Sequence, residues 1–292
     1  MTLRTQIQTE PSKGCLYIVA TPIGNLADIT HRAVETLKKV DWIAAEDTRH
    51  TKPLLNSMGM QKSLISLHEH NERQRAEQLL ARLQNGEQGA LVSDAGTPLI
   101  NDPGYHLVRL LREHDISVIP IPGVSAVITA LSCAGLPTDR FTYEGFLPAK
   151  NSKRLQALEK LARETRTLVF YESPHRLVES LQSMQTVFSS EREVVIGREL
   201  TKKFEQFVSG NFNEVCDYFE NNLDRVRGEF VVIVAGYLES EESTSKAAID
   251  IDKMIKVMLK QGLPVKQLAE IIAELSGEKK KAIYNRTLVL KE

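Results

Sequence analysis

LVSDAGTPLINDPG, residues 91–104, joins a short apolar run to a loop that is dense in glycine and proline. Gly96, Pro98, Pro103 and Gly104 lie too close together for the interior of a helix or strand. Glycine lets a ligand approach the main chain, and proline restricts the loop beforehand. In an open α/β sheet such a loop lies at the carboxyl end of a strand, where ligands bind. The stretch therefore predicts either a binding loop for a small polar ligand or an ordinary strand-to-helix connection.

A second loop of the same kind favours the binding interpretation. TPIGNL, residues 21–26, directly follows the apolar run Cys15–Ala20, so the chain begins with a strand, a glycine loop and a helix. Neither loop has the GxxxxGK[ST] pattern, or the GxGxxG pattern with an acidic residue about twenty positions later. A triphosphate or dinucleotide ligand is therefore disfavoured.

Apolar strands alternate with amphipathic helices through the first half of the chain. We expect strands at residues 15–20, 42–45, 90–93 and 116–121, and helices at residues 29–40, 72–84, 105–113 and 124–133. This alternation predicts a mainly parallel sheet with helices on both faces.

From about Pro122 the pattern predicts a second α/β domain with more mixed strand directions. Its expected helices are residues 155–163, 177–188 and 212–219, and its expected strands are residues 167–171, 194–198, 204–209 and 229–235. We expect the ligand cleft between the two domains.

The ends of the chain differ in character from these two domains. The predicted division is a tail at residues 1–14, α/β domains at 15–121 and 122–238, a linker at 239–245, and a helical unit at 246–292. Three amphipathic segments in the last unit predict a helix-turn-helix type of fold. The unit holds 10 Lys/Arg against 6 Asp/Glu, a local charge of +4. It is interpreted either as an RNA-docking unit or as a capping bundle with a solvated lysine face.

Composition bounds the class of protein. Hydrophobic residues make up 42% and charged residues 26% of the chain, and the net charge is −1. These values, the lack of an apolar stretch of about 18 residues and the lack of a signal sequence predict a soluble protein without a membrane span. Three widely spaced cysteines predict a reduced, cytoplasmic protein without disulfides or structural zinc. His68 and His70 have no evident third partner, so no metal site is expected, and Trp42 is expected in the core.

Seven motifs in order resemble a known family. They are TPIGNL at 21–26, EDTR at 46–49, SDAGTPLINDPG at 93–104, PGVSA at 122–126, GFLP at 145–148, YESPHR at 171–176 and GEFV at 228–231. This order resembles the small-subunit ribosomal RNA methyltransferases of the tetrapyrrole methylase superfamily, which use S-adenosylmethionine. The resemblance covers about Leu16 to Val234 and continues into the C-terminal segment. It implies two α/β domains of the tetrapyrrole methylase type, and a homodimer.

The resemblance also implies a set of cofactor-binding residues. These are Pro22, Gly24, Asp94, Ala95, Gly96, Thr97, Ile100, Ser125, Ala126, Tyr171 and Glu229. Backbone groups of such loops suit S-adenosylmethionine, which carries no phosphate. Asp94 is the first candidate for a polar anchor, or it caps its own turn.

The implied methyl acceptor is the 2′-hydroxyl of a cytidine in the decoding region of 16S ribosomal RNA, with the assembled 30S subunit as our expected substrate. A ribose hydroxyl reacts better beside a base or a cation that lowers its pKa. Glu46, Asp47 and Glu172 are the candidate bases, and Arg49 is a candidate phosphate clamp or hydroxyl polariser. Each acid is equally a candidate for an orienting salt bridge.

Basic residues supply the candidate RNA contacts. They are Lys150, Lys153, Arg154, Arg176, Arg198, Lys279, Lys280 and Lys281. Phe141, Tyr143 and Phe146 precede the first of these and are interpreted either as a stacking surface for a flipped base or as core residues.

Two alternative functions stay open. The first is a methyltransferase of the same fold that acts on a tetrapyrrole, although that branch usually carries a GGDPxxxG-like loop where this chain has SDAGTP. The second is a ligand-sensing regulator whose C-terminal helices bind nucleic acid.

Overall fold

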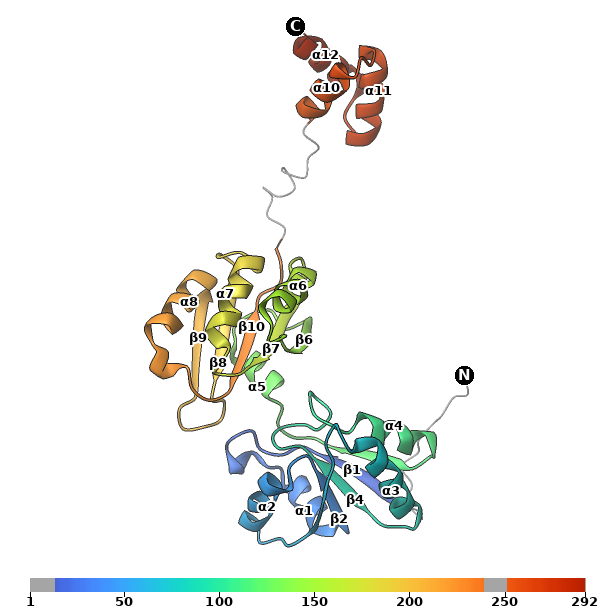
Figure 1. Cartoon of the computed structure of the whole chain (residues 1–292), viewed down its shortest axis with the longest axis vertical. Helices are drawn as coiled ribbons and strands as arrows, with labels where there is room; N and C mark the ends of the chain where they lie inside the picture. Colours follow the sequence, from blue (N-terminus) through green and yellow to red (C-terminus); the bar gives the residue numbers. More distant parts are fainter. Residues whose placement is uncertain (1–13, 239–250, 292) are drawn as a thin grey trace. The chain divides into compact units, whose positions relative to one another are not determined.

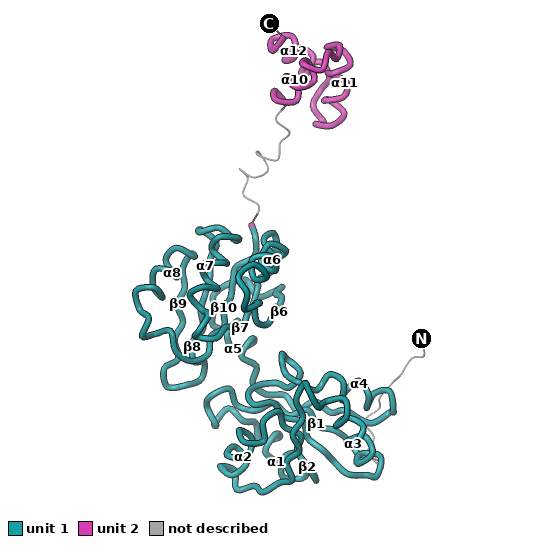
Figure 2. Tube along the Cα trace, in the orientation of Figure 1, with its two compact units in different colours: residues 1–237 teal, residues 238–292 magenta. Residues whose placement is uncertain are grey.

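The computed structural model describes residues 14–238 and 251–291 (Figure 1). The chain divides into two compact units, residues 1–237 and 238–292 (Figure 2). The predicted linker at 239–245 lies outside the described residues, as does the predicted tail apart from Gly14.

The first lobe of the larger unit is built on a parallel five-stranded sheet. Its strands are β1 (Cys15–Val19), β2 (Trp42–Ala45), β3 (Ser63–Ser66), β4 (Gly89–Val92) and β5 (Ser117–Ile121), in the order β3-β2-β4-β1-β5. All four pairings are parallel. Its helices are the 3-10 helix η1 (Leu26–Asp28), α1 (His31–Lys39), α2 (Thr48–Ser57), α3 (Glu72–Gln84) and α4 (Tyr105–Glu113).

Alternate residues of this sheet face two separate cores. Leu16 packs with buried residues of α3 and α4, whereas Val19 packs with those of α1 and α2. Trp42 is fully buried, which confirms the prediction that it is a core residue. The predicted parallel sheet with helices on both faces is therefore confirmed (Figure 1).

The second lobe is built on a mixed five-stranded sheet. Its strands are β6 (Phe141–Phe146), β7 (Thr167–Glu172), β8 (Glu193–Arg198), β9 (Gln206–Asn211) and β10 (Phe230–Val234), in the order β6-β7-β10-β8-β9. β6 and β7 are parallel and the other pairs are antiparallel, which confirms the predicted mixture. Its helices are α5 (Ala126–Cys133), α6 (Asn151–Leu161), α7 (Leu177–Phe188), α8 (Phe212–Asn221) and the 3-10 helix η2 (Leu223–Arg225).

One buried residue of the first lobe joins the core of the second lobe. Helices α6, α7 and α8 cover one face of the mixed sheet, and α5 packs on the other face with Val169, Val231 and Ile233. Ile23 of the first lobe belongs to this second cluster. The two predicted α/β domains are thus lobes of one compact unit, which ends at Tyr237.

The smaller unit is a three-helix bundle, as predicted. It consists of α10 (Ile251–Lys260), α11 (Val265–Ser276) and α12 (Lys280–Lys291) around Ile255, Leu268 and Ile283. Gly277, at φ +72°, ends α11 in the left-handed conformation that favours glycine. In the described part of the chain, no helix combines the length and apolar character needed to cross a membrane.

Candidate functional site

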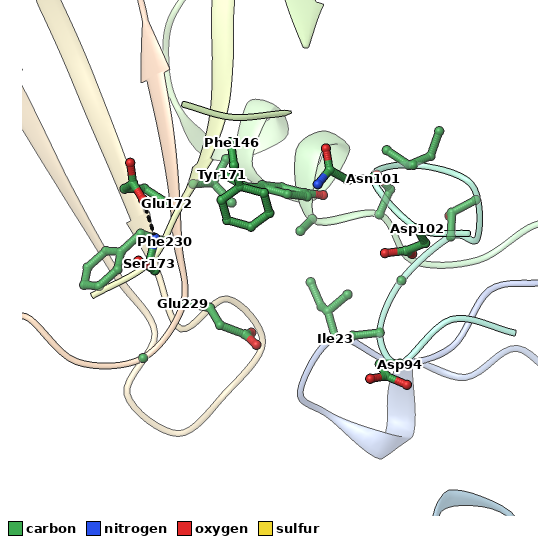
Figure 3. A pocket seen from close by; sticks show the side chains of 18 of the residues that line it. Ile23, Asp94, Asn101, Asp102, Phe146, Tyr171, Glu172, Ser173, Glu229 and Phe230 are labelled. Carbon is green, nitrogen blue, oxygen red and sulfur yellow. Dashed lines mark hydrogen bonds between the residues drawn. The ribbon is translucent and has the colours of Figure 1, made fainter. Parts of the chain in front are cut away.

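A cavity of about 330 Å³ lies between the two lobes (Figure 3). The first lobe contributes the loops after β1 and β4, and the second contributes the start of α5, the ends of β6 and β7 and the start of β10. The lining residues are Ile23, Asp94, Ala95, Gly96, Thr97, Ile100, Asn101, Asp102, Ser125, Ala126, Phe146, Tyr171, Glu172, Ser173, Pro174, Gly228, Glu229, Phe230 and Val231. Its volume is in the range of small-molecule sites.

The two glycine loops are tied directly to each other. Thr21 and Gly96 exchange reciprocal backbone hydrogen bonds of 2.9 and 3.0 Å. The Thr97 hydroxyl donates a 2.9 Å hydrogen bond to the carbonyl of Val124, in the PGVSA loop at residues 122–126. Gly96 itself has φ +79°, where other residues are strained. The cavity wall is therefore a preformed backbone surface.

The turn beyond this loop packs closely against β6. Leu99 and Asn101 both have φ +72°, which is uncommon for residues other than glycine. A Cβ placed on Gly145 would meet Asn101 Oδ1 at 2.6 Å, so β6 needs a glycine at that point. Backbone strain of this kind concentrates at functional sites.

The first-lobe side of the cavity is acidic (Figure 3). Burial, opposed in part by a hydrogen bond from Ser93, raises the pKa of Asp102 to about 6. Burial and then the charges of Asp102 and Asp94 raise the pKa of the adjacent Glu46 to about 6. No lysine or arginine is among the lining residues in the described part of the chain. The wall therefore favours a cation over a phosphate.

The second-lobe side supplies aromatic surface. The rings of Phe146 and Tyr171 lie 5.6 Å apart between centroids (Figure 3). The ring of Tyr143 lies 5.0 Å from that of Tyr171. Ile23 and Ile100 contribute apolar surface from the first lobe. A planar ring with a cationic group attached would match both sides of this cavity.

Most of the residues expected to bind the cofactor lie on this one cavity. Its lining includes Asp94, Ala95, Gly96, Thr97, Ile100, Ser125, Ala126, Tyr171 and Glu229. Pro22 and Gly24 are not among the lining residues. Gly24 instead faces Lys202, whose Cγ would lie 2.4 Å from an added Cβ.

Asp94 is oriented by the first turn of α2. Its Oδ1 accepts a 3.1 Å hydrogen bond from the backbone N–H of Asp47, and its Oδ2 lies 3.0 Å from Nδ1 of His50. Both carboxylate oxygens thus have partners outside the cavity.

Asp47 caps α2 and pairs with Arg49. It accepts a 2.8 Å bond from the Arg49 backbone, and the Arg49 guanidinium binds the same carboxylate at 2.6 Å. The Arg49 hydrogen bond holds the pKa of Asp47 at about 2. Such an acid is a weak proton acceptor, so the geometry favours the salt-bridge interpretation of Asp47.

Glu172 is held in the same manner. It is 3% exposed and accepts hydrogen bonds from the Ser173 backbone, Ser180 and Arg176. Arg176 also donates to the carbonyl of Leu147. The geometry therefore favours the salt-bridge interpretation of Glu172, with Arg176 as its partner.

The expected RNA contacts divide into exposed and buried residues. Lys150 and Lys153 are exposed at the start of α6, as are Lys279, Lys280 and Lys281 on the smaller unit, where Lys280 pairs with Glu270 at 2.9 Å. Arg154 is 2% exposed and donates to Ser183, and Arg198 is 9% exposed and donates to the carbonyl of Arg227. The burial of Arg154 and Arg198 does not favour their predicted role as RNA contacts.

Sequence reasoning missed several cavity residues. They are Ile23, Asn101, Asp102, Ser173, Pro174, Gly228, Phe230 and Val231. All of them stand inside the motifs described above, which was the signal that could have found them. Phe146, interpreted from the sequence as a stacking or core residue, also lines the cavity, at the end of β6 beside β7. Among the described residues, no group of three or more His, Cys, Asp or Glu is arranged to hold a metal ion.

Comparison with family models matches both units. Residues 15–216 match the tetrapyrrole (corrin/porphyrin) methylases, and residues 245–291 match the RsmI C-terminal HTH domain.

A curated relative in Escherichia coli O157:H7 is named ribosomal RNA small subunit methyltransferase I. It is 53% identical over 277 residues, which cover 95% of this chain and 96% of the relative. A relative of the same name in Haemophilus influenzae is 48% identical over 273 residues, covering 93% and 95% of the two chains.

Solved structures support the same fold for the larger unit. The methyltransferase CobJ matches with a TM-score of 0.58 at 17% identity, covering 76% of this chain and 94% of that one. A Thermus thermophilus uroporphyrin-III C-methyltransferase complexed with S-adenosyl homocysteine matches with a TM-score of 0.53 at 19% identity, covering 76% and 97%.

Proposed function

The chain belongs to the tetrapyrrole methylase family, alongside relatives named ribosomal RNA small subunit methyltransferase I, and from this we propose that it methylates the ribose 2′-hydroxyl of a cytidine in 16S ribosomal RNA. The proposed methyl donor is S-adenosylmethionine. The proposed acceptor lies in the decoding region, on the assembled small subunit.

One observation carries the proposal for the donor. A single cavity joins nine of the residues expected from the sequence motifs, and its two walls are acidic and aromatic. S-adenosylmethionine combines a sulfonium, an amino group and an adenine ring, and it has no phosphate. Asp94, Asp102 and Glu229 suit the cationic part, and Phe146 and Tyr171 suit the ring.

The start of α5 adds donors for an anionic group. Ser125 and Ala126 line the cavity, and the helix begins without a hydrogen bond from a capping side chain. The first N–H groups of a helix lack intrahelical acceptors and favour anions. The carboxylate of the donor's methionine part is the group that these N–H donors would satisfy.

When bound, the donor supplies an electrophilic methyl group for in-line displacement. The chain's part is to hold the acceptor oxygen in line, exclude water and take up the hydroxyl proton. The preformed loops at Thr21, Gly96 and Thr97 would hold the donor for this alignment, because their mutual hydrogen bonds fix the cavity before any ligand enters.

Methyl transfer to small ribosomal subunits tests this proposal. Subunits from cells that lack the protein would be incubated with radiolabelled S-adenosylmethionine, beside naked ribosomal RNA and a tetrapyrrole precursor. We expect label in subunit RNA, with one linkage resistant to alkaline cleavage, because a 2′-O-methyl group blocks that cleavage. Label only in the tetrapyrrole would favour the small-molecule alternative, and label in neither would favour the ligand-sensing regulator.

For the smaller unit, we propose RNA docking through phosphate contacts. Lys279, Lys280 and Lys281 are exposed where α12 begins. Changing all three to glutamine is expected to weaken subunit binding and to lower the salt dependence by about three charges. The matched control changes Lys38, Lys39 and Lys160, which are exposed on the larger unit, and equal losses in both triple variants would argue against a specific docking role.

A homodimer and a cytoplasmic location complete the proposal. Ile128 of α5 and Phe204 are 55% and 65% exposed, which leaves apolar surface on the second lobe for a partner copy. Sedimentation of the full chain would test the dimer, and a monomer at micromolar concentration would contradict it.

A further inference from the structure

His50 is linked to the cavity through a hydrogen bond to one of its lining residues. It follows Arg49 in the first turn of α2, and its side chain is 70% exposed. Its Nδ1 lies 3.0 Å from Oδ2 of Asp94, a residue that lines the cavity. The imidazole is therefore one hydrogen bond away from the proposed donor site.

The pairing with Asp94 fixes the roles of the two ring nitrogens. A carboxylate only accepts, so Nδ1 carries the proton that is donated to Asp94. In the neutral imidazole, Nε2 then holds the free lone pair, which is the arrangement of a general base oriented by a carboxylate.

Asp94 is itself held in place for this role. Its other oxygen accepts the backbone N–H of Asp47 at 3.1 Å. Both contacts come from the first turn of α2, so His50, Asp94 and the loop after β4 are positioned as one rigid group.

The charged groups around the imidazole support the same assignment. Asp94 raises the pKa of His50 first by its hydrogen bond and then by its charge, Asp47 adds to the rise, and burial and Arg49 oppose it. Among the candidate bases expected from the sequence, Asp47 and Glu172 form ion pairs with arginine, and Glu46 lies among like charges.

Resting on the proposed function, we propose that His50 is the general base of the reaction and that Asp94 is its positioning residue. The ribose 2′-oxygen forms a bond to the methyl carbon as the bond between that carbon and sulfur breaks, and the sulfur keeps the electron pair. Nε2 of His50 takes the hydroxyl proton and later releases it to water. Arg49, whose side chain is 88% exposed, is placed to contact the neighbouring phosphate.

The rate of methyl transfer to subunits, measured from pH 5.5 to 8.5 at saturating donor, tests this role. The wild-type rate is expected to rise with pH as the imidazole loses its proton. His50→Gln is expected to lose about 100-fold or more in rate, together with this acid limb. Donor affinity, measured by calorimetry, is expected to change by less than about threefold, because His50 is not part of the cavity lining.

Two further variants test whether the loss of rate in His50→Gln reflects proton transfer or a general disturbance of the structure. Asp94→Asn is expected to retain the acid limb but move it to lower pH, because the charge that raises the His50 pKa is gone. His114→Gln changes an exposed histidine at the end of α4 and is expected to behave as wild type.

The outcomes distinguish this assignment from the function on which it rests. If the wild type labels RNA while His50→Gln keeps the acid limb and a rate within about threefold, His50 is not the base and a carboxylate such as Glu46 takes that role. If the wild type labels no RNA at any pH, the proposed function fails, and this assignment fails with it.

Discussion

The carboxylates on the two sides of the cavity have opposite surroundings. On the second lobe, Glu172 is buried with an arginine, a hydroxyl and a backbone N–H around it. On the first lobe, Glu46 and Asp102 are partly buried among other acids, and the pKa of each is raised to about 6. A carboxylate with a complete set of partners thus stabilises the fold, whereas carboxylates that lie close to like charges favour the binding of a cation.

The largest expected effect comes from removing the structural carboxylate. Glu172→Ala leaves Arg176 and Ser180 without their acceptor in a buried position. We expect a loss of about 3–5 kcal/mol in the free energy of unfolding, measured by urea denaturation. Glu35→Ala, at a surface pair with Lys38, is the control and is expected to cost less than about 0.5 kcal/mol. A Glu172→Ala protein of wild-type stability that has lost turnover would make Glu172 catalytic and reverse the comparison.

The acids of the first lobe predict a pH dependence of stability. Their folded pKa values are raised, so the folded state binds more protons than the unfolded state. By linkage, their contribution is fully present below about pH 4 and is lost as the pH rises through about 6. We expect the contribution of these two acids to the free energy of unfolding to fall between pH 4 and pH 7.

Asp102→Asn isolates one part of that fall. Between pH 4 and pH 7, we expect the free energy of unfolding of the variant to fall by about 1–2 kcal/mol less than that of the wild type, after allowance for solvent screening. Asp139→Asn, at an exposed position, is the matched control. Equal slopes for wild type and Asp102→Asn would show that the pKa of Asp102 is not raised in the folded state.

The smallest expected effect concerns Glu229, the acid that the second lobe adds to the cavity. Lys202 lies 2.8 Å from Glu229 and 2.9 Å from Glu199, so this acid has a cation that Asp102 lacks. Lys202→Gln is expected to cost less than about 1 kcal/mol in thermal or urea unfolding, and the cost should vanish in high salt. Arg225→Gln, at an exposed pair with Asp224, serves as control. A salt-independent loss would place the role of Lys202 in its packing against Gly24.

The sequence predicted best those elements whose structure follows from a short local stretch of residues. Buried strands such as β2 and β4 are apolar throughout, and the loop at residues 94–97 supplies four cavity-lining residues within one short stretch. Among the α-helices and strands of the described residues, three escaped prediction. α2 buries only Thr51 and Leu55, β3 has no fully buried residue, and β6 is an edge strand with a bulge between Tyr143 and Gly145. Their apolar patterns are too weak to show a period.

The burial and the partners of a charged side chain depend on contacts with residues far away in the sequence, which no short motif contains. Arg154 stands in a basic run, yet its guanidinium is buried against Ser183, 29 positions away. His50 follows EDTR directly, but its pairing with Asp94 spans 44 positions and forms only when β2 and β4 lie side by side. Sequence motifs thus predicted much of the cavity lining, whereas the partners of its charged residues became visible only in the fold.

Calorimetric titration with S-adenosylmethionine tests the central claim most directly, namely that the cavity between the lobes holds the methyl donor. Ala126 lines the cavity at the first position of α5, where leucine is compatible with a helix but fills the space. Ala81→Leu, at an exposed position of α3, is the control. We predict one donor site per chain in wild type and Ala81→Leu, and an affinity at least about tenfold lower in Ala126→Leu. Undiminished binding by Ala126→Leu would contradict the account and place the donor elsewhere.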